Sequence, residues 1–266
     1  MGTYEIELGR LLDYGNPPEY VRWNRKRIIS CVDFLSKALP LKGLRTLDIG
    51  HDVHVGSLLM HSGCDLRGNV APLELRGHEA ARDMATFTDL AGHVHQWQLD
   101  AFDFEQSFPY PDASFDLVTA MEVLEHVSSS PRAFLKEIKR VLKPGGSIFI
   151  ATPNAAAWAK ILRTLDHAPS YDAKPYSQNF GPRHTMCHVY EYTPWELKDL
   201  LRSEGFEIAR FSTWDTYDSD PTGVRPTVLR FLFAGTLALL GYFRYAALMF
   251  KNRGHQIGLI ATLKTT

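Results

Sequence analysis

The chain has 266 residues, of which 45% are hydrophobic and 22% charged, so its composition is that of a globular protein and excludes a disordered or collagen-like chain. Its 29 basic and 30 acidic side chains give a net charge of -1, which argues against a nucleic-acid-binding surface spread over the whole molecule. Three cysteines without a Cys-x-x-Cys pair predict neither a zinc ribbon nor a disulfide framework, and they fit a reducing, cytoplasmic location.

Residues 1–44 are expected to form a helical lead-in, because apolar side chains from Val21 to Leu35 recur at helical spacing. The start, Met1–Glu7, has neither the basic end nor the apolar run of a secretory signal. From residue 45 onward, short apolar strands alternate with helical stretches, which predicts βαβ units and a mostly parallel sheet. The expected strands are 46–50, 64–69, 94–99, 115–120, 147–151, 206–212 and 256–263.

Two helix starts are clearly marked between the later strands. Ser130 is expected to cap a helix that opens at Pro131. Thr193 and Glu196 form the Thr-x-x-Glu pattern of a capping box at the start of a second helix. The insertion at about 155–190 is long for a plain connection, and we expect it to cover a substrate site rather than to form a separate domain.

The most apolar segment of the chain, at about 226–250, comes late. Its longest uncharged run, Phe231–Phe243, has 13 residues, whereas a membrane-spanning helix needs about 20. We therefore expect no spanning segment and interpret 226–250 as a helical element that is buried or faces a partner. The alternative is that this element binds peripherally to a membrane surface or contacts a second copy of the chain.

Ligands of open parallel sheets bind at the carboxyl ends of the strands, and the segments at those ends carry a family resemblance. These segments are Leu47–Gly50, Asp100–Ala101, Phe108–Val118, Glu122–Val127, Phe134–Asn154 and His188–Thr193. In order and spacing they resemble the motifs of class I methyltransferases that depend on S-adenosylmethionine (SAM), of the type 11 or 23 kind. The resemblance implies an α/β, Rossmann-like seven-stranded sheet in residues 45–266, with helices on both faces and an antiparallel last strand.

The resemblance also implies SAM as the cofactor and a binding site at the strand ends. The residues expected to bind SAM are Asp48, Gly50, His51, Asp52, Asn69, Asp100, Ala101, Met121 and Glu122. The first motif departs from the family's Gly-x-Gly-x-Gly pattern, because Asp52 and His54 stand at the second and third glycine positions. The acidic residue that binds ribose hydroxyls in such sites is replaced by Asn69 or Val70.

Methyl transfer to a hydroxyl needs in-line positioning and benefits from a base. The candidate catalytic residues are His126, after the fourth strand, and His184 and His188, from the expected cover. We expect O-methylation of a small molecule, a sugar or a secondary metabolite, and no metal is predicted for this reaction.

An alternative interpretation keeps the fold without SAM chemistry. Such a degenerate member would serve as a non-catalytic partner subunit, or it would bind a divalent metal through His51, Asp52 and His54, with His126 nearby. Other nucleotide enzymes are excluded, because the turn after Ile49 lacks the Gly-x-Gly-x-x-Gly of dehydrogenases and the chain has no Gly-Lys-Ser/Thr motif.

Overall fold

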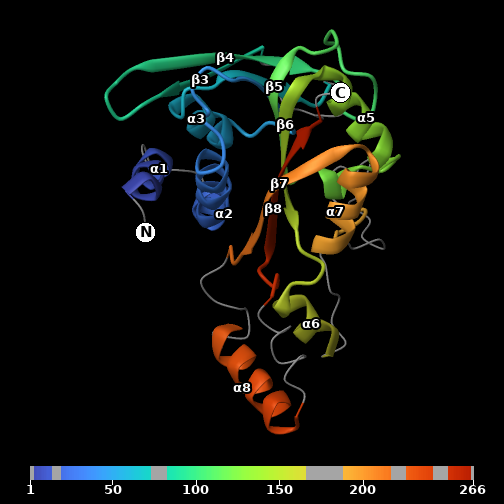
Figure 1. Cartoon of the computed structure of the whole chain (residues 1–266). Helices are drawn as coiled ribbons and strands as arrows, with labels where there is room; N and C mark the ends of the chain where they lie inside the picture. The colour runs from blue at the N-terminus through green and yellow to red at the C-terminus, as the bar shows by residue number, and fades with distance from the viewer. Residues whose placement is uncertain are drawn as a thin grey trace, which may run out of the picture.

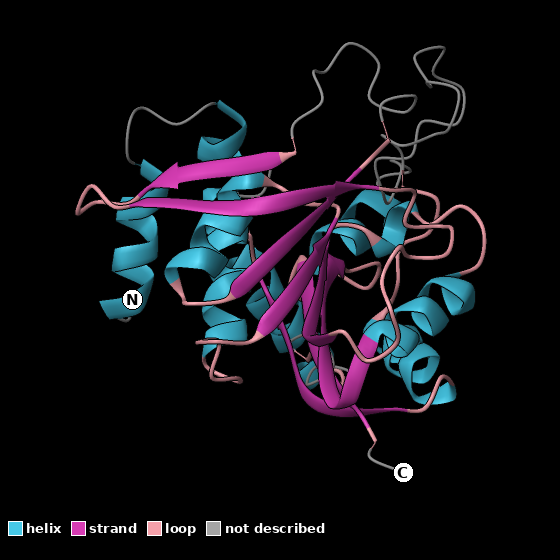
Figure 2. Ribbon diagram, turned by 90° about the horizontal axis from the view of Figure 1, so that it is seen from above, coloured by secondary structure: helices cyan, strands magenta, loops and turns pink. Residues whose placement is uncertain are grey.

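The computed structural model describes residues 3–13, 19–72, 83–165, 188–216, 226–241 and 251–264, which form one mixed sheet flanked by helices (Figure 1 and Figure 2). The strands are β1 (Arg45–Ile49), β2 (Asp65–Val70), β3 (Met84–Thr88), β4 (Val94–Ala101), β5 (Phe115–Met121), β6 (Leu142–Pro153), β7 (Phe206–Trp214) and β8 (Gln256–Leu263). The helices are α1 (Thr3–Asp13), α2 (Glu19–Ser36), α3 (Val53–His61), the 3-10 turn η1 (Leu124–His126), α5 (Pro131–Val141), α6 (Trp158–Leu165), α7 (Pro194–Ser203) and α8 (Pro226–Leu239).

The strand order is β3-β4-β2-β1-β5-β6-β8-β7. Strands β4, β2, β1, β5 and β6 run parallel, and β8 lies antiparallel between β6 and β7. This arrangement confirms the predicted Rossmann-like sheet with an antiparallel last strand. The sequence pattern misses one further strand, β3, which pairs with β4 as an antiparallel hairpin. The side chains of β3 are mostly exposed or half-buried, so this strand lacks the apolar run that marks a strand in a sequence.

Two apolar cores cover the two faces of the sheet, because neighbouring residues of a strand point to opposite sides. On β5, Val118 and Ala120 join the core beneath α5 and α7, whereas Leu117 and Met121 join the core beneath α2 and α3. Figure 1 shows these two helix layers on either side of the strands. The predicted helical lead-in thus packs its apolar side chains into the second core.

Both predicted helix starts are confirmed. Ser130 accepts a hydrogen bond of 3.4 Å from the backbone N–H of Ala133 at the start of α5. At the start of α7, Thr193 and Glu196 each accept from the other's backbone N–H, at 3.3 and 2.8 Å. Most of the predicted cover, residues 166–187, lies outside the described residues.

Helix α8 carries the described part of the apolar segment predicted at about 226–250, and residues 242–250 lie outside the described part. Phe231 and Leu232 on the helix, and Leu239 and Leu240 at its end, are exposed, Leu239 by 90%. The expectation of a buried helix is therefore wrong for these side chains, while a contact with a partner or a membrane surface stays a prediction. Among the described residues, no helix is long and apolar enough to cross a membrane.

Candidate functional site

The carboxyl ends of the parallel strands bring the predicted cofactor residues to one edge of the sheet. Asn69 on β2 pairs with Asp100 on β4. Just beyond β1, the backbone N–H of His51 donates to the carbonyl of Asn69 at 2.8 Å, and just beyond β5 the N–H of Glu122 donates to that of Ala151 at 2.8 Å. Loops that leave neighbouring strands at this edge are therefore fixed relative to one another, as a ligand site of such a sheet requires.

Two of these loops open with a left-handed backbone. Gly50 has φ of 66°, and a Cβ at this position would lie 2.5 Å from Cγ2 of Val123, so glycine is needed there. Glu122 has φ of 58°, which is uncommon for a residue with a side chain. Strained backbone of this kind gathers at functional sites, where the surrounding structure holds it in place.

His51, the residue after the glycine turn, points into the protein. Its Nε2 accepts a hydrogen bond of 3.0 Å from the indole N–H of Trp97, so the ring proton sits on Nδ1 and donates to Asp48 at 2.8 Å. The imidazole fills the space beside Gly56 and Gly68, where a Cβ on either glycine would collide with the ring. His51 thus supports the loop from within, and neither ring nitrogen is left for a ligand.

The carboxylate of Asp52 caps helix α3. It accepts from the backbone N–H groups of His54 at 2.7 Å and Val55 at 3.4 Å. With Asp52 engaged at the helix start and His51 turned inward, the described structure does not assemble the alternative metal site of His51, Asp52 and His54.

Asn69, one of the two residues expected at the position of the ribose-binding acid, has all its polar atoms bonded within the protein. It is 1% exposed, its Oδ1 accepts from the N–H of Gly50 at 3.2 Å, and its Nδ2 donates to the carbonyls of Phe102 at 2.8 Å and Val70 at 3.2 Å. Val70, the next residue, has only a hydrocarbon side chain. The side chains at this strand end therefore offer no hydrogen bond to a ribose.

Asp100 keeps its place at the end of β4 and is held from three sides. Its carboxylate accepts from the guanidinium of Arg67 at 2.9 Å, the phenol of Tyr110 at 2.6 Å and the amide of Gln98 at 3.0 Å. Burial, followed by the hydrogen bond to Asp100, raises the pKa of Tyr110 far above its usual range, so the phenol stays protonated as the donor.

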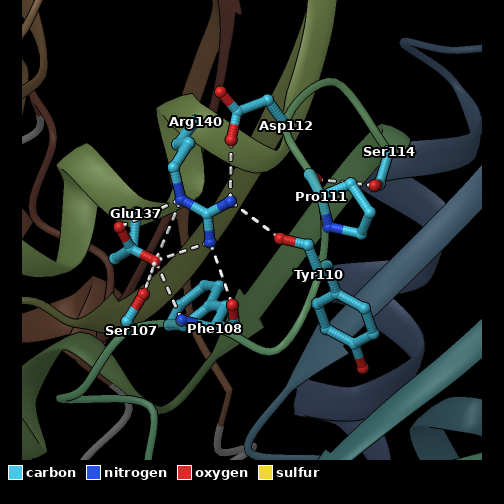
Figure 3. A network of polar contacts seen from close by, with 8 residues as sticks. All are labelled: Ser107, Phe108, Tyr110, Pro111, Asp112, Ser114, Glu137 and Arg140. Atoms are coloured by element: carbon cyan, nitrogen blue, oxygen red, sulfur yellow. Dashed lines mark hydrogen bonds and ion pairs between the residues drawn. The ribbon is translucent and has the colours of Figure 1, made fainter.

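A network around Arg140 of α5 positions the segment that carries Tyr110 (Figure 3). The guanidinium donates to the carbonyls of Tyr110 at 2.7 Å and Phe108 at 2.9 Å, and it pairs with Glu137 at 2.8 Å and Asp112 at 2.9 Å. In Figure 3 the ring of Tyr110 points away from Arg140. Backbone contacts on one side thus leave the phenol directed at Asp100 on the other.

Arg27 of the lead-in helix α2 reaches this edge, and no local pattern in the sequence predicts it. Its guanidinium pairs with the carboxylate of Glu122 at 3.2 Å and donates to the phenol oxygen of Tyr20 at 2.9 Å. The second oxygen of Glu122 accepts from the amide of Gln256 at 2.5 Å. The side chain that follows β5 is therefore held between the lead-in and β8.

The two predicted histidines that the structure describes meet next to η1. The rings of His126 and His188 lie 5.1 Å apart between centroids, at an angle of 79°. The backbone explains this meeting, since the N–H groups of Val189 and Tyr190 both donate to the carbonyl of Glu125, at 2.7 and 3.2 Å. The third candidate, His184, lies outside the described residues.

Two acidic side chains lie close to this histidine pair. Glu191, 6% exposed, accepts from Nδ1 of His188 at 2.8 Å and pairs with Lys160 of α6. Burial opposes the charge of Glu191, but the bonds from His188 and Lys160 outweigh it and lower the pKa of Glu191. Glu125, fully buried, accepts from the hydroxyl of Thr152 at 2.8 Å through one oxygen. Burial, and then the charge of Glu122, raise the pKa of Glu125 well above its usual range.

Comparison with known protein families shows which family this fold belongs to. The Methyltransf_23 family model, described as a methyltransferase domain, matches residues 20–210. The chain belongs to this methyltransferase family. The match begins within α2 and ends within β7, so it includes both the loop after β1 and the histidine pair.

Named relatives of the methyltransferase point the same way. A ubiquinone biosynthesis O-methyltransferase of Xanthomonas oryzae pv. oryzae (strain PXO99A) is 35% identical over 179 residues, 66% of this chain and 68% of the relative. One from Ralstonia nicotianae (strain ATCC BAA-1114 / GMI1000) is 30% identical over 184 residues, 67% of this chain and 69% of the relative.

Solved structures share the fold. A SAM-dependent methyltransferase from Thermotoga maritima, a possible histamine N-methyltransferase, aligns with a TM-score of 0.55 at 19% identity, over 97% of this chain and 99% of its own. A putative Haloferax volcanii methyltransferase, solved with its Trm112 activator, aligns with a TM-score of 0.54 at 14% identity, over 99% of both chains. The predicted family resemblance and SAM as the family cofactor are confirmed.

At the strand ends of the methyltransferase, the backbone conformation is compatible with SAM. The left-handed turn at Gly50, the left-handed Glu122 and the Asp100–Ala101 pair stand where the family resemblance places the cofactor. The fit is poorest at the ribose, because Asn69 is fully used by the protein and Val70 has no polar group. The residues that could hold SAM are therefore those at the remaining strand ends.

Proposed function

We propose that the methyltransferase transfers the methyl group of SAM to a hydroxyl oxygen of a small molecule. The relatives named as O-methyltransferases support oxygen as the accepting atom. The observation that carries the proposal is the pair of His126 and His188, which lies beyond β5 and beside the end of β6, with Glu191 bonded to His188 and the carboxyl group of Glu125 within 4.8 Å of both imidazoles. A hydroxyl acceptor benefits from such groups because its proton must leave as oxygen attacks.

In this proposal the cofactor rests on the turn at Gly50, on Asp100 and Ala101 at the end of β4, and on the backbone of Met121 and Glu122. Bound SAM supplies an electrophilic methyl group on a sulfonium. His51, Asp52 and Asn69 keep the loop in shape through their own internal contacts rather than by touching the cofactor.

On the acceptor side, the Glu191 carboxylate holds the proton of His188 on Nδ1. Nε2 of His188 then carries a lone pair, which is the form in which an imidazole can accept a proton from a hydroxyl. The sequence favours a sugar or secondary-metabolite acceptor, whereas the names of the relatives favour an acceptor from ubiquinone biosynthesis. The shared chemistry is a hydroxyl on a small molecule.

The first test is calorimetric titration of dialysed protein with SAM and with S-adenosylhomocysteine. We expect a dissociation constant at or below ~100 μM, about -5.5 kcal/mol. A panel of phenols, catechols and sugars is then incubated with protein and SAM, and S-adenosylhomocysteine is quantified by mass spectrometry. Folded protein that binds no SAM at millimolar concentration, and methylates nothing in the panel, would overturn the proposal.

The matched test of the histidine pair compares His188→Ala with His95→Ala. His95 is also held by a carboxylate, Asp89 at 3.0 Å, but it lies on the β3–β4 hairpin at the far edge of the sheet. We expect His188→Ala to lower kcat by about 10²- to 10⁴-fold, with little change in SAM affinity, and His95→Ala to keep full activity. Equal activity of both variants would contradict a role of the pair in the reaction.

A further inference from the structure

We propose that Glu125, His126 and His188 form a binding site for a divalent transition-metal ion. A carboxylate oxygen of Glu125 and one ring nitrogen from each histidine lie within 4.8 Å of one another, and among the described residues this is the group of donors spaced to share one ion. Donor atoms around one tetrahedral zinc ion lie roughly 3.3 Å apart. The donor atoms would therefore move closer to one another, by up to about 1.5 Å, when an ion binds.

The backbone supplies the preorganisation of this site. Glu125 and His126 belong to the rigid turn η1, in which the N–H of His126 donates to the carbonyl of Val123 at 2.9 Å. The strand-like segment after His188 is fastened to the same turn by its two hydrogen bonds to the carbonyl of Glu125. The three donors thus come from two segments that are joined directly, so binding an ion would order few additional groups.

Glu191 and Lys160 provide the support that metal-bound histidines usually have. A ligating imidazole typically donates its other N–H to a carboxylate, which fixes the ring and its tautomer. Nδ1 of His188 makes this contact with Glu191, and Lys160 in turn pairs with Glu191. With Nδ1 donating to Glu191, Nε2 carries the lone pair of this imidazole, as a metal ligand requires.

A second, independent observation points to a missing ligand. Oε1 of Glu125 is fully buried and has no hydrogen-bond partner among the described residues, while Oε2 accepts from Thr152. A buried carboxylate oxygen without a partner is costly and calls for an explanation such as an ion. A divalent cation between Glu125 and the two imidazoles would satisfy this oxygen.

The donor set selects the class of ion. Two imidazoles and one carboxylate suit Zn²⁺, Co²⁺, Mn²⁺ or Fe²⁺, whereas Mg²⁺ and Ca²⁺ prefer oxygen ligands throughout. Three protein ligands leave a coordination position open, as in catalytic rather than structural zinc sites.

The inferred role of the ion rests on the proposed O-methyl transfer, although its binding does not. An acceptor hydroxyl in the open position would lose its proton more readily, because a bound cation lowers the pKa of a coordinated oxygen. The O–H bond breaks with the proton passing to solvent. The oxygen lone pair then forms the new O–C bond as the C–S bond of SAM breaks and S-adenosylhomocysteine leaves.

Metal binding is tested on untagged, full-length protein stripped with a chelator and dialysed. Zn²⁺ is titrated by calorimetry, and Co²⁺ binding is followed by its visible absorption. We expect about one ion per chain in the parent protein, loss of binding in His126→Ala and His188→Ala, and a weakening of about 10- to 100-fold in Glu191→Gln, which removes the supporting carboxylate.

The matched control is the double variant His93→Ala and His95→Ala, which removes two imidazoles held by Asp89 on the β3–β4 hairpin. This control is expected to bind the ion like the parent. Circular dichroism melts establish that each variant is folded. Folded parent protein that binds no Zn²⁺ or Co²⁺, or binding that falls equally in the control and in His188→Ala, would overturn the site.

The role of the ion is tested separately from the function. Stripped protein is assayed for methyl transfer before and after addition of Zn²⁺, Co²⁺ or Mn²⁺. We expect low activity that returns with one of these ions. Full activity of metal-free protein would overturn the role of the ion and leave the histidine pair itself as the base, so the proposed function would stand. Absence of SAM binding would overturn the proposed function and leave the metal site to the titration.

Discussion

The phenol of Tyr110 donates a hydrogen bond of 2.6 Å to Asp100, the acidic residue at the end of β4. The same tyrosine is fastened through its carbonyl to Arg140 of α5. A helix on one face of the sheet thereby sets the direction of a carboxylate at the cofactor edge. The contact is shielded from water on the tyrosine side, since burial is the main cause of the raised pKa of the phenol.

Tyr110→Phe is therefore expected to weaken SAM binding by about 3- to 10-fold, because the loss of one hydrogen bond, worth about 1 kcal/mol, leaves Asp100 held only by Arg67 and Gln98. Calorimetric titration with SAM measures the effect. Asp112→Asn is the control from the same segment, since it removes an exposed contact of Arg140 and leaves Tyr110 and Asp100 in place. Equal affinities of the two variants would show that Asp100 does not depend on Tyr110.

The Arg140 network gives a prediction on pH. The hydrogen bond from Arg140 is the largest cause of the lowered pKa of Glu137, and it outweighs the opposing effect of burial. A carboxyl whose pKa is lower in the folded state stabilises the fold above its unfolded pKa of about 4.3, and this stabilisation is lost as the pH falls through the lowered folded value.

We expect Glu137→Gln to lower the free energy of unfolding by about 1–3 kcal/mol at pH 7, with a smaller difference from the parent at pH 3. Urea unfolding at both pH values measures this. Lys136→Gln, on the same helix, is the control, and a Glu137→Gln deficit that stays constant with pH would show that the Arg140 pair contributes no pH-linked stability.

His51 is the residue of the altered first motif whose structural role is clearest. Its ring bridges Asp48 and Trp97 and fills the space beside Gly56 and Gly68. His51→Ala would leave a cavity together with two buried polar groups that have lost a partner. We expect a loss of about 2–4 kcal/mol in the free energy of unfolding.

His54→Ala is the matched control for His51, because His54 is a half-buried histidine three residues later, in the first turn of α3, whose described hydrogen bond is made by its backbone N–H. Its expected loss is within about 0.5 kcal/mol. Urea unfolding compares the two variants. Similar losses in both would mean that the inward contacts of His51 contribute little to stability.

Local patterns in the sequence predict the regular parts of this protein well, because those patterns report on local physics. The caps at Ser130 and Thr193 depend on side chains within three residues, and the apolar runs of β1, β5, β6 and β8 report burial on both faces. The sequence pattern does not predict strand β3, because β3 is held by backbone pairing with β4 and most of its side chains are not buried.

The sequence does not predict which distant segments come into contact at the site. The pairing of Arg27 with Glu122 spans two elements far apart in the chain. His126 and His188 are both predicted from their motifs, yet only the hydrogen bonds to the Glu125 carbonyl show that they meet. His51 is expected at the cofactor, but its Nδ1–H donates to Asp48 and its Nε2 accepts from Trp97 of β4, so both nitrogens are bonded within the protein.

A substitution at the end of β2 is expected to increase the affinity for SAM. Val70 is half-buried and stands beside the fully engaged Asn69, at the strand end where related sites carry the acid that binds ribose hydroxyls. Val70→Asp would supply a carboxylate at that place. Two ribose hydroxyls would then have a charged acceptor, and we expect SAM affinity to rise about tenfold, which corresponds to about 1.4 kcal/mol.

Val70→Thr is the matched control for this change, since threonine has nearly the shape of valine and no charge. Calorimetric titration of both variants with SAM and with S-adenosylhomocysteine gives the comparison, and the gain in Val70→Asp should be equal for the two ligands, which share the ribose. A carboxylate at position 70 that leaves both affinities unchanged would place the ribose elsewhere, and the cofactor would then lie against β4 and β5 rather than against β2.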